Sequence, residues 1–123
     1  APNNSKLYHY ILVKSNIILK MDISKLNVNE MRNNVESSAA FLKLLSNPTR
    51  LLVLCNLIES ERCVGDLERD LDISQSALSQ HLSKMRDEGI VKSEKQGQHV
   101  FYSISDSNVV DIINVLYKLF CKK

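Results

Sequence analysis

Cysteine is scarce in this chain, and its three cysteines form no familiar cofactor motif. The sequence has no Cys-x-x-Cys pair, no glycine-rich phosphate-binding loop and no Gly-x-Ser-x-Gly segment. No nucleophile stands beside a base in a pattern typical of a catalytic site. We therefore predict that the protein is not an enzyme and uses no cofactor. Three cysteines are also not a framework of structural disulfides, so we expect core residues, metal ligands or redox-active thiols.

Long hydrophobic runs and a strong net charge are missing as well. No stretch of 18 apolar residues and no signal-peptide layout is present, so we expect a cytosolic protein with no membrane partner. The net charge of +2 does not suggest a non-specific nucleic-acid coat, but it allows a specific binder whose positive charge is local. A chain of 123 residues predicts one domain with a small core, which dimerisation would supplement.

Residues 1–20 differ in pattern from the rest of the chain. Apolar residues there are interrupted by Lys6, Lys14 and Lys20, and Met21 is a plausible native start. We interpret 1–20 as a leader, tag or translated upstream sequence, with a genuine N-terminal arm as the alternative. Residues 21–123 are then predicted to form the folded domain.

Two helices are predicted before residue 60. From Asn29, the apolar residues keep helical spacing at Met31, Val35, Ala39, Leu42 and Leu45. Asn47 and Pro48 are a typical N-cap and first residue of the next helix. Its apolar face is predicted to contain Leu51, Leu54, Cys55 and Ile58.

Residues 63–104 have the pattern of a helix-turn-helix followed by a hairpin. Leu67 and Leu71 anchor a short first helix, and Ser74 is an N-cap for the second. That second helix has an apolar stripe of Leu78, Leu82 and Met85 and stops at Gly89. Polar side chains on its other surfaces suit base edges and phosphates in the DNA major groove. From this helix and its cap, the predicted DNA contacts are Ser74, Gln75, Ser76, Ser79, Gln80, His81 and Lys84.

A β-hairpin wing is predicted after Gly89. Its strands are residues 90–95 and 99–104, joined by a loop at Gln96-Gly97-Gln98. Lys92, Lys95 and Gln98 are its predicted DNA contacts. The fold class is therefore mainly α with a small β-hairpin, a winged helix-turn-helix.

The last predicted helix begins after Asp106 or Ser107, either of which would serve as its cap. It is apolar over much of its circumference, with one face formed by Val109, Ile112, Ile113, Leu116 and Phe120. A helix of this kind is buried in a large core or pairs with a partner. The chain is too short for the first option, so we predict a homodimer built by the first and last helices.

The histidines and cysteines give little support to a metal site. His9, His81 and His99 are scattered, and Cys63 has Gly65 where a Cys-x-Cys pair would need its second thiolate. The ordinary role of Cys55, Cys63 or Cys121 is a small buried hydrophobic residue. Helix packing would also allow Cys55 to approach Cys121, but the sequence alone leaves this open.

These segments together resemble the ArsR/SmtB family of bacterial winged-helix regulators. The resemblance covers about Asn29 to Cys121 and depends mainly on residues 44–51, 64–67 and 74–82. The ending, residues 109–121, resembles the branch of BigR-, SqrR- and HlyU-type proteins. That branch lacks the metal motif and senses reactive sulfur or oxidants with two cysteines, which match Cys55 and Cys121.

The resemblance implies a homodimer on palindromic double-stranded promoter DNA. It also implies that reactive sulfur species or an oxidant link the two thiols directly or through added sulfur, acting as the effector of a repressor. Cys63 departs from the two-cysteine pattern. The alternatives are a metal-responsive regulator of the same family, or a redox-insensitive DNA-binding anti-silencer.

Overall fold

The computed structural model describes residues 27–121, so the predicted leader at 1–20 lies outside the described residues. The chain divides into two compact units, residues 1–40 and 41–123. The first contributes most of helix α2, Val28–Leu45, which begins where Asn27 and Glu30 cap each other. This start is one residue before the predicted one.

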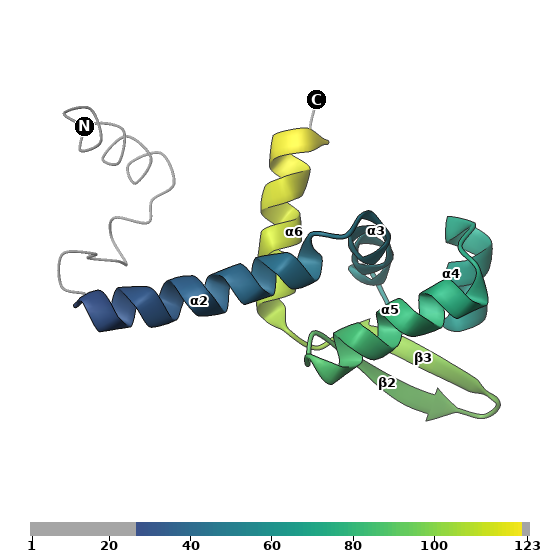
Figure 1. The fold of residues 1–123 in the computed structure, drawn as a ribbon. Coiled ribbons are helices and arrows are strands. Elements are labelled where there is room, and N and C mark those ends of the chain that lie inside the picture. Colours follow the sequence, from purple (N-terminus) through teal and green to yellow (C-terminus); the bar gives the residue numbers. More distant parts are fainter. Residues whose placement is uncertain (1–26, 122–123) are drawn as a thin grey trace. The chain divides into compact units, whose positions relative to one another are not determined.

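The second unit contains the predicted helix-turn-helix and wing (Figure 1). In chain order its elements are α3 (Pro48–Leu57), β1 (Arg62–Cys63), α4 (Val64–Leu71), α5 (Gln75–Asp87), β2 (Val91–Gln96), β3 (His99–Ile104) and α6 (Ser107–Phe120). The order and type of the predicted elements are confirmed. Strand β1 was not predicted.

The helix starts follow the capping residues of the sequence. The Asn47 side chain accepts a hydrogen bond of 3.0 Å from the amide of Arg50, and Pro48 opens α3. Ser74 does the same for α5 through the amide of Ala77, at 3.3 Å. For α6 the structure selects Asp106 over Ser107, since its carboxylate accepts from the amide of Asn108 at 2.9 Å. Each contact pairs a backbone donor that the first helical turn leaves free.

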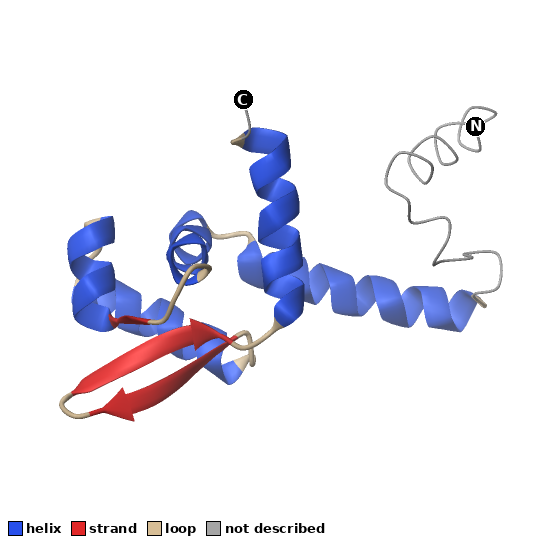
Figure 2. Ribbon diagram, turned by 180° about the vertical axis from the view of Figure 1, so that it is seen from behind, coloured by secondary structure: helices blue, strands red, loops and turns tan. Residues whose placement is uncertain are grey.

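The hairpin differs by one residue from the prediction. Ile90 is still tied to α5, because its amide donates to the Met85 carbonyl at 3.0 Å, so β2 begins at Val91. Gln96 pairs with His99, which leaves a two-residue turn of Gly97 and Gln98 rather than a three-residue loop. Gly97 has φ 64°, the conformation that a type II′ turn requires at this position. Figure 2 shows the hairpin extending beyond the helices of this unit.

Strand β1 attaches the hairpin to the helix-turn-helix. Arg62 pairs with Tyr102 and Cys63 with Phe101, so the sheet order is β1-β3-β2, all antiparallel. Beneath the sheet lies an apolar core whose fully buried members are Val53, Leu54, Leu67, Leu78, Leu82, Met85, Ile90 and Val109. This core fixes α5 by its predicted stripe, and the fold is a winged helix-turn-helix as predicted.

Candidate functional site

The exposed side of α5 carries the polar residues predicted to contact DNA. Leu78, Leu82 and Met85 are fully buried, so the helix cannot rotate without opening the core. The predicted contacts that this orientation leaves exposed are Ser74, Gln75, Ser76, Ser79, Gln80 and Lys84. A helix held in this way presents short hydrogen-bonding side chains at fixed positions, which a major groove can accommodate.

Three of these side chains already have partners. The Ser74 hydroxyl accepts the capping bond from Ala77 and lies 3.3 Å from the Ser76 hydroxyl. Lys84 Nζ lies 3.8 Å from a carboxylate oxygen of Glu88. Such an exposed ion pair contributes little, so it leaves Lys84 free to exchange Glu88 for a phosphate.

Other residues of α5 beside this exposed surface differ in how accessible their side chains are. His81 is half-buried and lies beside the apolar stripe, which makes it the least accessible of the predicted contacts. Ser83 and Arg86 are also exposed on α5 and were not among the predicted contacts. Ser83 follows Ser79 by four residues and Arg86 follows it by seven, so helical periodicity was the signal that would have found them.

The two wing lysines lie on opposite faces of the hairpin. Side chains alternate along β2, where Val91 is buried and Ser93 is half-buried. Lys95 shares their face, which is the face that packs toward α5, whereas Lys92 lies on the other face with Glu94. Gln96 is held near β1 by a 3.3 Å bond from its amide to the Glu61 carboxylate. Gln98 is exposed in the turn.

This alternation predicts unequal effects of the two lysines. Lys95→Ala should weaken binding to all DNA sequences alike and lower the slope of log affinity against log salt by about one unit, as expected for one lost phosphate contact. Lys92→Ala should change this slope less, because Lys92 lies on the face away from α5 and beside the Glu94 carboxylate. Fluorescence anisotropy across a salt series measures both. A larger change of slope in Lys92→Ala would contradict this assignment of the two faces.

A cavity of about 600 Å³ lies between α3 and α6, and both Cys55 and Cys121 line it. Its apolar walls come from both helices: Leu51, Ile58, Ile113, Leu116 and Phe120. Cys55 was predicted on an apolar face and is exposed there, while its neighbours Val53, Leu54 and Leu57 point into the core. The approach of Cys55 to Cys121, left open by the sequence, is thus favoured by one shared cavity.

The electrostatics of Cys55 agree with this placement. Partial burial raises the pKa of the Cys55 thiol above its ordinary value, and the nearby Cys121 raises it further because two adjacent thiolates repel each other. Both cysteines are free thiols. The site therefore holds two free thiols around one cavity, and the surroundings of Cys55 disfavour its thiolate.

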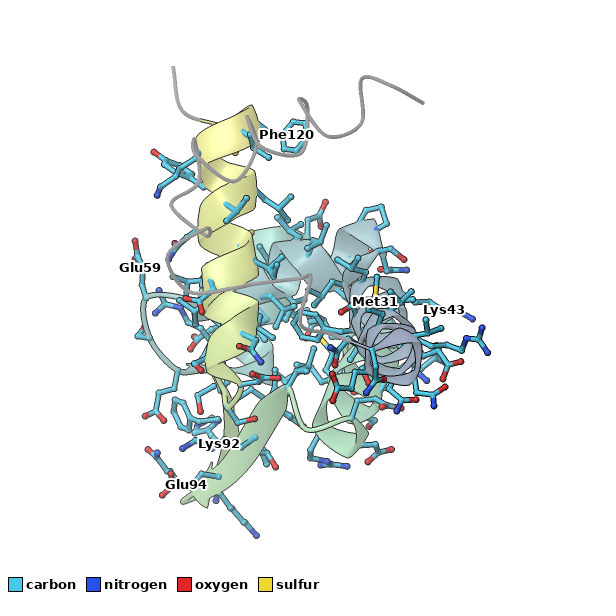
Figure 3. The ribbon with its side chains drawn as sticks, turned by 90° about the vertical axis from the view of Figure 1, so that its left-hand side faces the viewer. Met31, Lys43, Glu59, Lys92, Glu94 and Phe120 are labelled. Carbon is cyan, nitrogen blue, oxygen red and sulfur yellow. The ribbon has the colours of Figure 1, made fainter. Side chains whose placement is uncertain are left out.

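The unit separates the two surfaces. In Figure 3, Phe120 lies at the end of α6 and Glu59 beside that helix, whereas Lys92 and Glu94 lie on the hairpin at the other end. No residue of the cavity belongs to α5 or to the hairpin. The two thiols and the predicted DNA contacts therefore lie on separate parts of this unit.

Residues 47–93, from the start of α3 into β2, match the model of the family described as "Bacterial regulatory protein, arsR family". The transcriptional activator HlyU of Vibrio cholerae is 41% identical over 97 residues, 79% of this chain and 90% of the relative. This chain belongs to the ArsR family. It is therefore a DNA-binding transcriptional regulator and not an enzyme.

Relatives of this ArsR-family regulator include a biofilm growth-associated repressor of Xylella fastidiosa, 36% identical over 107 residues, 76% of this chain and 94% of the relative. Among solved structures, reduced HlyU from Vibrio cholerae matches with a TM-score of 0.73 at 41% identity, over 77% of this chain and all of that one. BigR from Xylella fastidiosa matches with a TM-score of 0.72 at 35% identity, over 80% of this chain and all of that one. The fold of the regulator is therefore that of its relatives.

Cys63 lies apart from the other two cysteines of the regulator. It ends β1 and serves as the N-cap of α4, where its amide donates to the Asp66 carboxylate at 3.5 Å. Hydrogen bonding with Cys63, and then with Arg69, lowers the pKa of Asp66. Cys63 does not line the cavity. Within residues 27–121, no group of three His, Cys, Asp or Glu side chains is placed to hold a metal ion, and no helix is long and apolar enough to cross a bilayer.

The raised pKa of Cys55 has a measurable consequence. Only the thiolate form of a cysteine is alkylated. The alkylation rate of Cys55 should therefore keep rising with pH beyond the point at which the alkylation rate of an ordinary, solvent-exposed thiol levels off. In Cys121→Ser the midpoint should move back toward the ordinary value without reaching it, because burial remains. Iodoacetamide labelling followed by peptide mass spectrometry across pH 7–11, a range of about four units around the ordinary cysteine pKa, measures this. A Cys55 midpoint at or below that of a small reference thiol would contradict the assigned environment.

Proposed function

We propose that this regulator is a homodimer that binds palindromic promoter DNA and loses affinity when Cys55 and Cys121 become covalently linked. The observation that carries the proposal is the cavity between α3 and α6, which both thiols line. A link across this cavity would add a covalent connection between α3 and α6.

The DNA-binding part of the proposal is supported by the burial of α5. Its apolar stripe is anchored in the core, and its polar side is exposed, as are Lys95 and Gln98 of the wing. We assign base contacts to Gln75, Ser76, Ser79 and Gln80, and backbone contacts to Ser74, Lys84, Lys95 and Gln98, with smaller contributions from His81 and Lys92. Glutamine pairs well with adenine edges, so adenines are expected in each half-site.

The homodimer is supported by apolar residues of α6 that are exposed in the part of the chain that the structure describes. Val115 and Leu119 are four residues apart on α6, 49% and 69% exposed, and neither lines the cavity. Packing this face against a second copy would place two α5 helices on one side, one DNA turn or about 34 Å apart. Sedimentation equilibrium should give a mass twice that of one chain, which is 14.0 kDa. Leu119→Glu places a charge on the proposed interface and should lower the measured mass toward that of one chain.

The switch requires a two-electron oxidant. Two thiols give up two electrons and two protons to form one disulfide, and a reactive sulfur species can instead leave extra sulfur atoms in the link. Tying α6 to α3 then moves the dimerisation helix relative to α5, and a small shift is sufficient because packed interfaces tend to have two discrete arrangements. The Xylella fastidiosa relative is named a repressor and the Vibrio cholerae relative an activator, so these names support control by promoter binding without fixing its sign.

A gel-shift series on the DNA upstream of the regulator's own gene tests this proposal. The protein is used reduced, treated with polysulfide and then re-reduced, or loaded with zinc. We expect tight binding by the reduced protein, a reversible loss after polysulfide and no response to zinc. A response to zinc alone would favour the metal-responsive alternative, and no response to either would favour the anti-silencer.

A further inference from the structure

We propose that Ser105 is a positioning residue for DNA binding, which ties the hairpin wing to the C-terminal end of α5 and so fixes the place of Lys95 beside that helix. Ser105 lies in the link between β3 and α6 and is not itself among the residues assigned to DNA. The proposal depends on the DNA contact assigned to Lys95 and adds the residue that places this lysine. It rests on the way in which α5 ends and on two hydrogen bonds that Ser105 donates.

Helix α5 ends in a Schellman motif, which uses the carbonyl groups of its last turn. Gly89 has φ 80°, and its amide donates to the Arg86 carbonyl at 3.0 Å. The amide of the next residue, Ile90, donates to the Met85 carbonyl at 3.0 Å. The carbonyls of Gly89 and Ile90 lie beyond these bonds, so they need donors from another segment or from solvent.

Ser105 supplies a donor to both of these carbonyls. Its amide donates to the Ile90 carbonyl at 3.0 Å, and its hydroxyl donates to the Gly89 carbonyl at 2.8 Å. The first bond continues the hairpin ladder beyond Val91 and Ile104, and any residue except proline could make it. The second bond needs a side-chain donor at this position. It joins the base of the hairpin to the turn that ends α5, where Figure 1 shows these segments meeting.

The other hydrogen-bonded attachments of the wing lead to a different part of the unit. Strand β1 pairs with the middle of β3, and the Gln96 amide donates to the carboxylate of Glu61, which directly precedes β1. These contacts set the wing relative to β1, whereas the hydroxyl of Ser105 sets it relative to α5. Since the buried stripe of α5 fixes that helix in the core, the Ser105 bond determines how far Lys95 lies from its polar side.

A phosphate contact from Lys95 is sensitive to small rotations at the base of the wing. Lys95 is exposed and follows the buried Val91 by four residues, which corresponds to about 13 Å along a strand. Over this length a rotation of about 10° moves Lys95 by about 2 Å. A displacement of this size is enough to break a charge-assisted hydrogen bond of about 2.8 Å. Loss of one hydrogen bond shifts an equilibrium by roughly two- to tenfold, so without the Ser105 hydroxyl displaced positions of the wing become populated.

Ser105→Ala should lower the slope of log affinity against log salt by between about half a unit and one unit, because a phosphate contact is weakened or lost. Its loss of affinity should therefore be about two- to threefold larger at about 50 mM than at about 200 mM salt. Ser105→Thr keeps the hydroxyl and should restore the wild-type slope. Fluorescence anisotropy of the full-length protein with a duplex from the DNA upstream of its own gene measures these slopes. Partial unfolding would reduce the active fraction equally at every salt concentration and leave the slope unchanged.

A double variant and a matched control show whether Ser105 acts through Lys95. Ser105→Ala combined with Lys95→Ala should bind no more weakly than Lys95→Ala alone, because the contact that Ser105 positions is already absent. The control is Ser46→Ala, which removes an equivalent exposed bond. The Ser46 hydroxyl donates to the Lys43 carbonyl at the end of α2, at 2.9 Å. This variant should keep the wild-type slope.

The outcomes separate the role of Ser105 from the DNA contact on which it rests. A wild-type slope in Ser105→Ala beside a lowered slope in Lys95→Ala would overturn the role of Ser105 and leave the Lys95 contact intact. Additive losses of affinity in the double variant would overturn that role as well. A wild-type slope in Lys95→Ala would show that the Lys95 contact is wrongly assigned, and the positioning role would be wrong with it.

Discussion

Cys55→Ser and Cys121→Ser should each bind operator DNA like the wild type when reduced and should each lose the whole response to polysulfide. A covalent link needs both sulfur atoms, whereas the polar side of α5 needs neither. Neither cysteine belongs to α5 or the hairpin, so binding by the reduced variants should stay within about threefold of wild type, a difference below 0.7 kcal/mol. Gel shifts of reduced and treated protein measure both properties.

Cys63→Ser is the matched control for these two variants. It removes the third thiol, which lies at the start of α4 and outside the cavity, so most of the response should remain. Mass spectrometry of the treated wild type should find Cys55 joined to Cys121, with or without inserted sulfur. A full response in Cys121→Ser, or a cross-link to Cys63, would show that the thiols are wrongly assigned.

Joint replacement of Gln75, Ser76, Ser79 and Gln80 by alanine should abolish sequence preference without unfolding the protein. These side chains are exposed, while α5 is anchored by its buried stripe. Each good base contact contributes about 1–3 kcal/mol of discrimination, so losing even the weaker contacts should reduce the preference for operator over random DNA by roughly a thousandfold. Binding to random DNA through backbone contacts should persist.

Competition binding with operator and scrambled duplexes measures this preference, and circular dichroism checks the fold. The double variant Asp111→Ala and Lys118→Ala, at exposed positions of α6, serves as the control and should keep the preference. An unchanged preference in the fourfold variant would show that α5 is not the recognition helix.

The helices of this protein were predictable because their signals are local. Asn47 with Pro48, and Ser74, act within one turn of the helix that they start, and Gly89 has the positive φ of 80° that its position at the end of α5 suggested. The periodicity of Leu78, Leu82 and Met85 fixed the orientation of α5. From these residues the fold class and most of the candidate DNA-binding surface could be predicted.

The remaining features depend on contacts between distant segments. Strand β1 has only two residues, Arg62 and Cys63, too few for an alternating pattern, and it forms by pairing with Tyr102 and Phe101 of β3. The one-residue shift of the hairpin has a similar origin, since the bond from Ile90 to Met85 decides where β2 begins. Local sequence preferences carry no information about either contact.

The thiol site was predictable only in part. Spacing placed Cys55 on α3 and Cys121 at the end of α6, but the packing of these helices decides whether the two share a cavity. Glu59 and Asn114 had no distinguishing pattern in the sequence, and they belong to the site because of that packing. A charged residue after a helix end is ordinarily interpreted as a solvated surface residue.

The separation of the cavity from the DNA-binding surface has an evolutionary consequence. Because the residues around Cys55 and Cys121 include none from α5 or the hairpin, substitutions on one surface leave the other chemically unchanged. Descendants of one ancestral regulator can therefore acquire new operators while keeping the same inducer, or acquire a new inducer while keeping the same operator. The two specificities evolve as separate modules within a single small domain.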